Sequence, residues 1–266
     1  DQYNLQGGGN PNLGAESADT VTFGVVVDAT EDLTFAIDYW DVEIEGTIAS
    51  LGAQLTLDQC AKTGSADYCN LVTRSPNGSL WQGTAGYINT AVTNLGEKHW
   101  EGVDIEGDYS MNLGEGTLNI GALATYMLSK ETTPIPTDSS LTYDCVSVIN
   151  ANCFATPEWR TRTSVSYSTG ANWTAGLTVR TMSGMDNEYA PDLIAQEAVE
   201  DAYNLLDVNF TYNVNDNLSV RANINNLFDK EPPIVGDVLS GGYGNTVSGF
   251  YDTLGMYWNV SVTANY

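Results

Sequence analysis

The sequence predicts an all-β protein whose antiparallel strands span a membrane, and three observations support this. Segments of about ten residues alternate apolar and polar side chains, the connections alternate between short and long, and no apolar run approaches the ~18 residues of a membrane-spanning helix. The composition agrees with them. The chain has 266 residues with 26 Gly and 15 Tyr, a usage typical of strands joined by turns.

Nine segments show the alternation that is expected of strands with a different environment on each face. In the last segment Val260 and Val262 share the apolar face, while Asn259 and Ser261 share the polar one. In chain order the segments are 21–27, 33–39, 103–109, 118–124, 159–167, 173–179, 206–212, 218–224 and 256–266.

The connections divide into two kinds that follow one another regularly. The short ones, rich in Gly, Asn and Asp, are 29–32, 112–116, 169–172 and 213–217, whereas the long ones are 46–86, 130–157, 183–201 and 229–252. Long loops at one end only, with Arg, Asp and Asn on the inward face, are typical of an outer-membrane β-barrel with short periplasmic turns. A soluble β-sandwich is the alternative, because its strands also alternate.

The charge balance excludes one class of partner. The chain carries 34 Asp and Glu against 9 Lys and Arg, a formal charge of −25. Nucleic-acid binding needs clustered basic side chains to displace counterions from phosphates. We therefore expect no nucleic-acid partner.

The four cysteines form two close pairs in polar stretches, Cys60 with Cys69 and Cys145 with Cys153. Two local disulfides, each within an external loop, are the natural interpretation, and they imply an oxidising compartment. A zinc site is the alternative. It would need Cys-x-x-Cys or additional His spacing, which the sequence lacks.

The sequence gives little sign of catalysis or of a cofactor. His99 is the single histidine, with Glu97 and Glu101 as its acidic sequence neighbours, and we interpret it as an ordinary loop residue of a protein that is not an enzyme. Asp186, Glu188 and Asp192 are a weak Ca²⁺ candidate without EF-hand spacing, and solvated acidic loops are commoner.

Four stretches resemble the TonB-dependent outer-membrane receptors, specifically the C-terminal part of their barrel. They are the Gly-Asn-Pro-x-Leu stretch of 9–26, the Gly-Val-Asp step of 94–109, ANINNLFDKEPP at 222–233 and the terminal 251–266. By this resemblance, Trp258 and the closing Tyr266 belong to a barrel-assembly signal. The family's plug domain and TonB box are not found in the sequence.

The resemblance implies that residues 1–266 are the C-terminal segment of a barrel of about 22 strands, of which this chain supplies about nine. An open sheet of nine strands would expose unpaired backbone groups to hydrocarbon, so it cannot be stable alone in a bilayer. The strands near 20–27 and 255–266 should therefore both pair outside this set of nine. Assembly of several copies is the alternative.

Charged and aromatic side chains are the candidate functional residues. Expected in the lumen are Arg160, Arg162, Arg180, Arg221, Asp104, Glu106 and Asp207. Mutual charge balance is the preferred interpretation of this set, while contact with an acidic plug surface or an anionic solute is the alternative. Trp81, Tyr87 and Tyr243 are aromatic loop residues that could stack on a ligand, or equally cover a loop core.

The function that the resemblance implies is active import of a scarce ligand, a siderophore, vitamin or oligosaccharide, across the outer membrane of a Gram-negative bacterium. Its partners would be outer-membrane lipid, the remaining strands and plug of the receptor, TonB through that plug, and a small-molecule ligand. A passive porin-like channel and a surface-structural or self-associating fragment are the alternatives.

Overall fold

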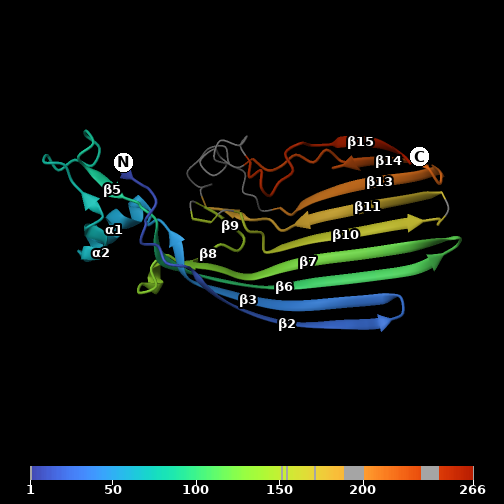
Figure 1. Cartoon of the computed structure of the whole chain (residues 1–266), viewed down its shortest axis with the longest axis horizontal. Helices are drawn as coiled ribbons and strands as arrows, with labels where there is room; N and C mark the ends of the chain where they lie inside the picture. The colour runs from blue at the N-terminus through green and yellow to red at the C-terminus, as the bar shows by residue number, and fades with distance from the viewer. Residues whose placement is uncertain are drawn as a thin grey trace. The chain divides into compact units, whose positions relative to one another are not determined.

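The computed structural model describes residues 2–150, 152–153, 155–170, 172–188, 201–234 and 246–265. Its main feature is one large sheet with the strand order β15-β14-β13-β11-β10-β7-β6-β3-β2, to which the short β8 (Tyr143–Asp144) adds by pairing with β7 (Figure 1). The strands are β2 (Ser17–Thr30), β3 (Leu33–Ala49), β6 (Thr93–Leu113), β7 (Gly116–Thr133), β10 (Trp159–Ser168), β11 (Trp173–Met182), β13 (Tyr203–Asn215), β14 (Leu218–Asn225) and β15 (Tyr257–Ala264).

Eight of the nine predicted segments lie within one strand each and the ninth, 256–266, contains β15, so the prediction of an antiparallel all-β fold is confirmed. Several strands are longer than predicted. For example, β6 has 21 residues and β7 has 18. The interpretation of His99 as a loop residue is wrong, since β6 begins at Thr93 and includes it. A run of charged residues around His99 hides this part of the strand from a search for alternating apolar side chains.

The tight turns between neighbouring strands agree with the short connections of the sequence. Gly114 connects β6 to β7 with a φ of 62°, and Gly170 follows β10 with a φ of 75°. Both conformations are left-handed, which glycine adopts without steric cost. These turns keep consecutive strands adjacent in the sheet.

The two edges of the sheet are β2 and β15. Within the described part of the chain each pairs with a single neighbour in this sheet, β3 and β14 respectively. Nearly every side chain of both strands is exposed. The sheet is therefore open along both edges, as the sequence predicts.

The register places the predicted apolar and polar side chains on opposite faces of the sheet. Val208 pairs with Ile224, which pairs with Trp258, whereas Asn209 pairs with Asn223, which pairs with Asn259. The first set lies on what we call the apolar face and the second on the polar face. Asn223 Nδ2 donates to Asn259 Oδ1 at 2.9 Å on the polar face.

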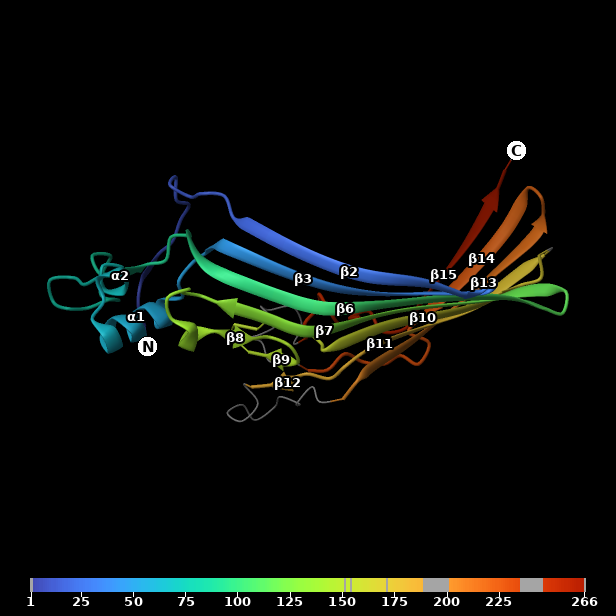
Figure 2. The same ribbon diagram turned by 90° about the horizontal axis from the view of Figure 1, so that it is seen from below.

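The chain forms two compact units, which are described separately. The first consists of residues 1–20, 42–99 and 131–143, and the second of 21–41, 100–130 and 144–266. In the second unit the strands curve and twist together, as Figure 2 shows for β10 to β15. No helix among the described residues is long and apolar enough to cross a membrane.

The first unit contains a small folded subdomain, formed by the first long connection together with short segments before and after it. It consists of α1 (Ala53–Thr63), α2 (Ala66–Cys69) and a three-stranded sheet of β1 (Leu5–Gln6), β5 (Tyr87–Asn89) and β4 (Val72–Thr73). Ala53, Leu80 and the fully buried Ile88 form its core. The Cys60–Cys69 disulfide joins the two helices.

The second unit has its own buried cluster, beside the ends of β11 and β13. Met182, Met185, Tyr203 and Leu205 pack there against loop residues that include Ile149 and Tyr251. The Cys145–Cys153 disulfide closes the loop that contains β9 (Val148–Ile149), and β9 pairs with β12 (Asp186–Asn187). The packed loops of this cluster therefore cover one end of the polar face.

Candidate ligand-binding site

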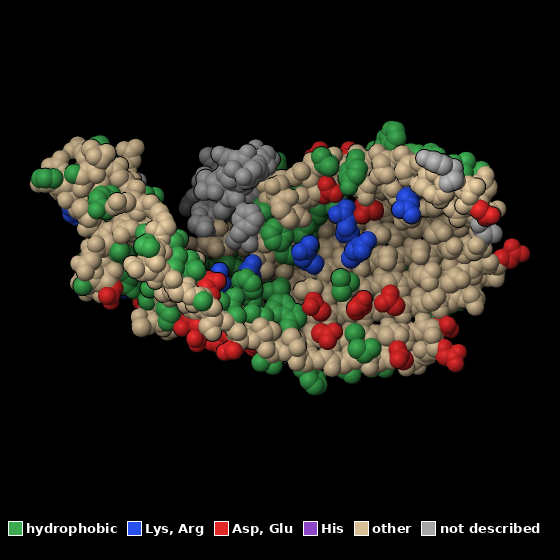
Figure 3. Space-filling model, viewed as in Figure 1, with side chains coloured by type: hydrophobic (Ala, Val, Ile, Leu, Met, Phe, Trp, Pro, Cys, Tyr) green, Lys and Arg blue, Asp and Glu red, His purple; other side chains and the backbone are tan. Residues whose placement is uncertain are grey.

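A cavity of about 620 Å³ opens on the polar face of the second unit. Four basic side chains line it: Lys130, Arg160, Arg162 and Arg180. Four aromatic side chains line it as well: Trp40, Trp100, Tyr203 and Phe250. Figure 3 shows basic side chains gathered over this part of the sheet, with acidic ones on either side.

Strand pairing explains why the three arginines meet. Arg162 is directly paired with Arg180 across β10 and β11, and Arg160 lies two residues from Arg162 on the same face. Side chains that are directly opposite in a sheet lie about 5 Å apart at Cβ, where like charges repel one another. A strand pair with two arginines opposite each other therefore needs negative charge nearby.

Arg180 obtains that negative charge from two carboxylates. Its Nε donates to Asp207 Oδ2 at 2.8 Å, and its Nη2 donates to Asp207 Oδ1 at 3.1 Å. Nη2 also lies 3.4 Å from Asp252 Oδ2, in the loop before β15. Asp207 in turn accepts the backbone N–H of Asn226 at 2.9 Å. Arg180 is thus neutralised and held in place.

Arg160 and Arg162 have a different environment. Within the described part of the chain no carboxylate lies within ion-pair distance of either guanidinium. The Arg160 guanidinium carbon lies 5.9 Å from the centre of the Phe250 ring, a cation–π distance. Lys130 donates from Nζ to Thr156 Oγ1 at 2.8 Å and lies 5.7 Å from the centre of the Trp100 ring. The cavity therefore has a net positive lining.

The aromatic wall is held by packing. Tyr203 contacts Tyr251 edge to face, with ring centres 5.1 Å apart, and Tyr251 is 3% exposed. Burial raises the pKa of the Tyr251 phenol, so the side chain stays neutral beside the charged cavity. An aromatic wall beside fixed cations can bind a flat anionic group by stacking and charge together.

The remaining predicted polar-face residues lie outside the cavity. Asp104 accepts a hydrogen bond from Thr125 Oγ1 at 2.6 Å, and Glu106 is exposed on β6. Neither makes an ion pair with an arginine among the described residues, so Asp207 alone of the three predicted acids balances one. Arg221 donates from Nε to Thr211 Oγ1 at 3.3 Å on the same face.

The predicted loop and terminal residues are dispersed. Trp81 is 54% exposed and Tyr87 is half-buried in β5, both in the first unit. Trp258 is 71% exposed on the apolar face of β15. Tyr243 and Tyr266 lie outside the described residues.

The contacts of the three acidic residues of the weak Ca²⁺ candidate and of His99 complete the set of predicted site residues. Asp186 lies in β12, Glu188 Oε2 accepts from Asn150 Nδ2 at 2.7 Å, and Asp192 lies outside the described residues. His99 lines a hollow of about 270 Å³ in the first unit with Glu97 and Glu131. No group of three or more His, Cys, Asp or Glu side chains among the described residues is arranged to hold a metal ion.

Sequence reasoning missed Asp252, Lys130, Tyr203 and the aromatic wall of the cavity. Asp252 and Phe250 belong to a loop without periodicity, so no pattern places them over β10 and β11. Tyr203 precedes the predicted segment of β13, but it lies an even number of residues from Asp207 and therefore on the same face of the strand. This even spacing was the one signal in the sequence that could have identified it.

Comparison with known proteins agrees with this architecture. A family model described as TonB dependent receptor-like, beta-barrel matches residues 1–227. No curated protein matches the chain.

Solved structures resemble it throughout its length at low sequence identity. The ferric enterobactin receptor of Pseudomonas aeruginosa, in complex with BCV-L6, superposes with a TM-score of 0.62 at 18% identity, covering 98% of this chain and 34% of the receptor. The siderophore receptor PirA of Acinetobacter baumannii gives 0.58 at 15%, covering 98% and 33%. The copper transporter OprC gives 0.56 at 16%, covering 96% and 32%.

The chain spans about a third of the length of these structures. At such identities the structural similarity supports the fold alone. In that fold, this sheet corresponds to part of a receptor barrel. The family match extends over most of the chain and includes the strands that carry the four basic cavity residues. The chain therefore belongs to the family of TonB-dependent receptor-like β-barrels.

Proposed function

We propose that the chain forms the C-terminal part of the barrel wall of a TonB-dependent importer in the outer membrane of a Gram-negative bacterium, with the polar face turned to the lumen. Two open edges support this. The unpaired backbone groups of β2 and β15 would each cost several kcal/mol in hydrocarbon. Further strands of a closed barrel would pair with them, and a plug domain inside the barrel would couple it to TonB.

The observation that carries the proposal is the cationic, aromatic cavity on the polar face. In a chain with a net charge of −25, four of the nine basic residues line this one cavity. Such a lining fits a negatively charged ligand with flat rings, and a ferric catecholate is a ligand of this chemistry. A free copper ion, as the name of one structural neighbour suggests, fits the arginines and lysine poorly, because cations repel it.

The experiment uses the complete receptor in a Gram-negative strain that lacks its own ferric catecholate receptors. Uptake of radioactive iron as ferric enterobactin is measured with TonB present and with TonB deleted. The importer predicts uptake that requires TonB. Uptake that persists without TonB would instead support the passive channel, and no uptake in either strain would exclude a catecholate ligand.

Matched variants test the cavity itself. Arg160→Gln with Arg162→Gln should lower uptake about tenfold or more, because a hydrogen bond to a charged group contributes about 1.5 to 3 kcal/mol. Arg221→Gln is the control, since Arg221 lies on the same face but outside the cavity. Equal loss in both variants would show a general effect of charge on the polar face.

A further inference from the structure

We propose that the Asp252 carboxylate is an internal competitor of the ligand: it occupies Arg180 in the unliganded receptor and yields this place to an anionic oxygen of the ligand. Arg180 lines the cationic cavity, and Asp252 lies in the loop that precedes β15. The inference deepens the proposed function and rests on it, because it assumes that an anionic ligand enters this cavity. It concerns how tightly the receptor holds that ligand.

The two carboxylates that contact Arg180 are held unequally. Asp207 accepts from Arg180 Nε at 2.8 Å and from Nη2 at 3.1 Å. Asp252 accepts from Nη2 through Oδ2 at 3.4 Å, and its Oδ1 accepts the Leu254 N–H at 3.4 Å. Hydrogen bonds between charged groups are about 2.7 to 2.9 Å long. Asp207 is therefore tightly bound to Arg180, whereas Asp252 is loosely bound.

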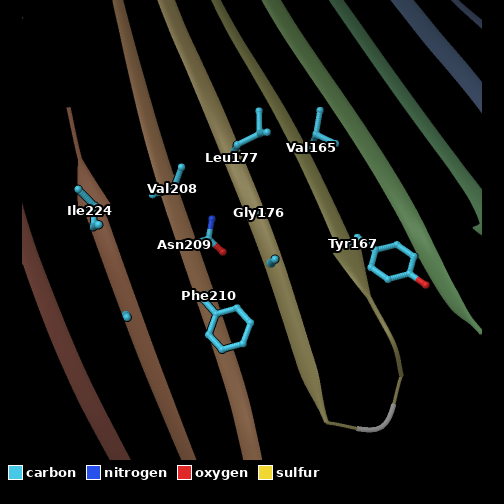
Figure 4. Close-up of a pocket in the computed structure, with 10 residues that line it drawn as sticks. Val165, Tyr167, Gly176, Leu177, Val208, Asn209, Phe210 and Ile224 are labelled. Carbon is cyan, nitrogen blue, oxygen red and sulfur yellow. The ribbon is translucent and has the colours of Figure 1, made fainter. Parts of the chain in front are cut away.

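The surroundings of Asp207 make it a fixed partner. Asp207 lies in β13 next to Val208, which Figure 4 shows opposite Leu177 of β11. Its carboxylate also accepts the N–H of the fully buried Asn226 at 2.9 Å. If this side chain turned away, it would leave a buried N–H without an acceptor, which is costly. Asp207 therefore stays on Arg180 whether or not a ligand is bound.

The surroundings of Asp252 allow its side chain to turn away. Asp252 lies outside any helix or strand, and β15 begins only at Tyr257. The N–H that it accepts belongs to Leu254, which is 74% exposed. Water can replace the carboxylate there as a hydrogen-bond partner. Rotation of Asp252 toward solvent therefore leaves no buried group unpaired.

The residues before Asp252 keep the loop in place during such a rotation. Tyr251 is 3% exposed, and its ring contacts the Tyr203 ring edge to face with centres 5.1 Å apart. The N–H groups of Phe250 and Tyr251 donate to Val247 O at 2.9 and 3.0 Å. The proposed exchange is therefore a side-chain rotation at Asp252, and the aromatic wall of the cavity stays where it is.

Local charge explains why the ligand and Asp252 exclude each other at Arg180. One guanidinium between two carboxylates carries a local net negative charge, so a third anion at the same group is repelled. Once Asp252 turns away, an oxygen of the ligand can accept the N–H that it releases. Within the described part of the chain no carboxylate lies at ion-pair distance from Arg160 or Arg162, so both attract the ligand in either state.

Competition of this kind lowers the apparent affinity of the receptor. The apparent Kd equals the intrinsic Kd divided by the fraction of receptor whose site is competent to bind. Loss of the Asp252 carboxylate raises that fraction and tightens binding. If Asp252 served only to hold Arg180 in place, its loss would weaken binding instead. The two roles therefore predict changes of opposite sign.

The first test measures the Kd of ferric enterobactin for the complete receptor in detergent, by quenching of tryptophan fluorescence. Asp252→Asn keeps the size of the side chain and removes its charge, so binding should become tighter by about fivefold or more. Binding that is unchanged or weaker would overturn the proposal.

Asp229→Asn is the matched control for the loss of a negative charge. Asp229 lies in the same connection between β14 and β15, outside the cavity, where its Oδ1 accepts the Met256 N–H at 2.7 Å. Asparagine can accept the same hydrogen bond, so this variant should change the Kd by less than about twofold. If Asp229→Asn tightened binding as much as Asp252→Asn, the effect would be one of overall charge, and the proposal would be wrong.

A second measurement does not depend on whether the variant folds. It is a structure of the unmodified complete receptor with bound ferric enterobactin. Asp252 Oδ2 should then lie more than about 4 Å from Arg180 Nη2, and a catechol oxygen should lie within about 3.2 Å of that nitrogen. A bound ligand with Asp252 still at Arg180 would overturn the inference.

Failure of this inference can be distinguished from failure of the proposed function. Uptake that requires TonB, together with no tightening in Asp252→Asn, contradicts only the internal competitor. Tighter binding in Asp252→Asn, together with uptake that does not require TonB, contradicts only the importer.

Discussion

Arg180 and Asp207 form a two-point ion pair across β11 and β13, with donor to acceptor distances of 2.8 and 3.1 Å. The two residues are not directly opposite, because Arg180 pairs with Leu205 and Thr178 pairs with Asp207. The diagonal contact lets the same carboxylate also accept the Asn226 N–H. One acid therefore connects the cavity to the end of β14.

The first prediction removes the charge of that acid. Asp207→Asn should lower the free energy of unfolding by about 1 to 2 kcal/mol, a value at the low end for charged hydrogen bonds because Arg180 is 37% exposed. The measurement is urea unfolding of the purified receptor in detergent. Asp104→Asn is the control, since Asp104 makes no ion pair among the described residues. Equal destabilisation by both variants would contradict the assigned role of Asp207.

The second prediction concerns the close approach of Gly102 to Trp40. A Cβ at Gly102 would clash with Cζ2 of the Trp40 ring and would lie 2.9 Å from the Tyr126 backbone oxygen. Gly102→Ala should therefore destabilise the receptor by about 1 to 3 kcal/mol, the usual cost of overpacking. Because Trp40 lines the cavity, the variant should also weaken ligand binding.

Gly107→Ala is the matched control for this substitution. Gly107 lies in the same strand, and a Cβ there would meet nothing within 4 Å. Thermal unfolding, followed as the shift of the folded band in electrophoresis, compares the two. If Gly102→Ala unfolds at the temperature of Gly107→Ala, the tight contact with Trp40 does not exist.

The third prediction concerns the first disulfide. Replacing Cys60 and Cys69 together by Ser should loosen the subdomain of α1 and α2 by about 2 to 3 kcal/mol, because the bridge closes a short loop. The large sheet should keep its stability, since the subdomain has its own core of Ala53, Leu80 and Ile88. Limited proteolysis should therefore cut the double variant first within residues 53–69.

The same double replacement at Cys145 and Cys153 is the comparison. That bridge lies beside the buried cluster of the second unit, with Cys153 fully buried. Its removal should therefore weaken ligand uptake, whereas removal of the first bridge should leave the cavity unchanged. Cleavage within 53–69 at the same rate with and without the bridge would contradict the third prediction.

The large sheet was predictable from the sequence because its signal is local and repeated. A period of two residues determines both the strand and its facing, as Val208 and Asn209 illustrate by pairing with residues of their own kind. The order of the strands followed from short turns, which force neighbours in sequence to be neighbours in the sheet. Sequence reasoning therefore predicted that the arginines lie on one face of the sheet.

The loops were not predictable in the same way. Gly64, with a φ of 65°, ends α1, and Ser65 accepts the Asp67 N–H at the start of α2, yet both helices lie in a segment that was predicted as loop. Asp252 reaches Arg180 from 72 residues away in sequence. Contacts between such distant segments depend on loop packing, for which a single sequence contains no periodic signal.

The last prediction concerns Asn226, in the run 222–233 that resembles the receptor family. Asn226 is fully buried with a φ of 51°, its Nδ2 donates to Lys230 O at 2.9 Å, and its Oδ1 accepts from Lys230 N at 2.8 Å. Its own N–H donates to Asp207. Asn226 therefore ends β14 and connects the following loop to the ion pair beneath the cavity.

Two substitutions separate its backbone role from its side-chain role. Asn226→Gly keeps the left-handed conformation and loses the two side-chain hydrogen bonds, so the free energy of unfolding should fall by about 2 kcal/mol. Asn226→Ala loses the same bonds and adds the steric cost of a positive φ, for a total of about 3 to 4 kcal/mol. Urea unfolding of the two variants should rank alanine below glycine. The reverse order would show that the stability contributed by Asn226 does not depend on its left-handed conformation. It would also show that β14 ends for another reason.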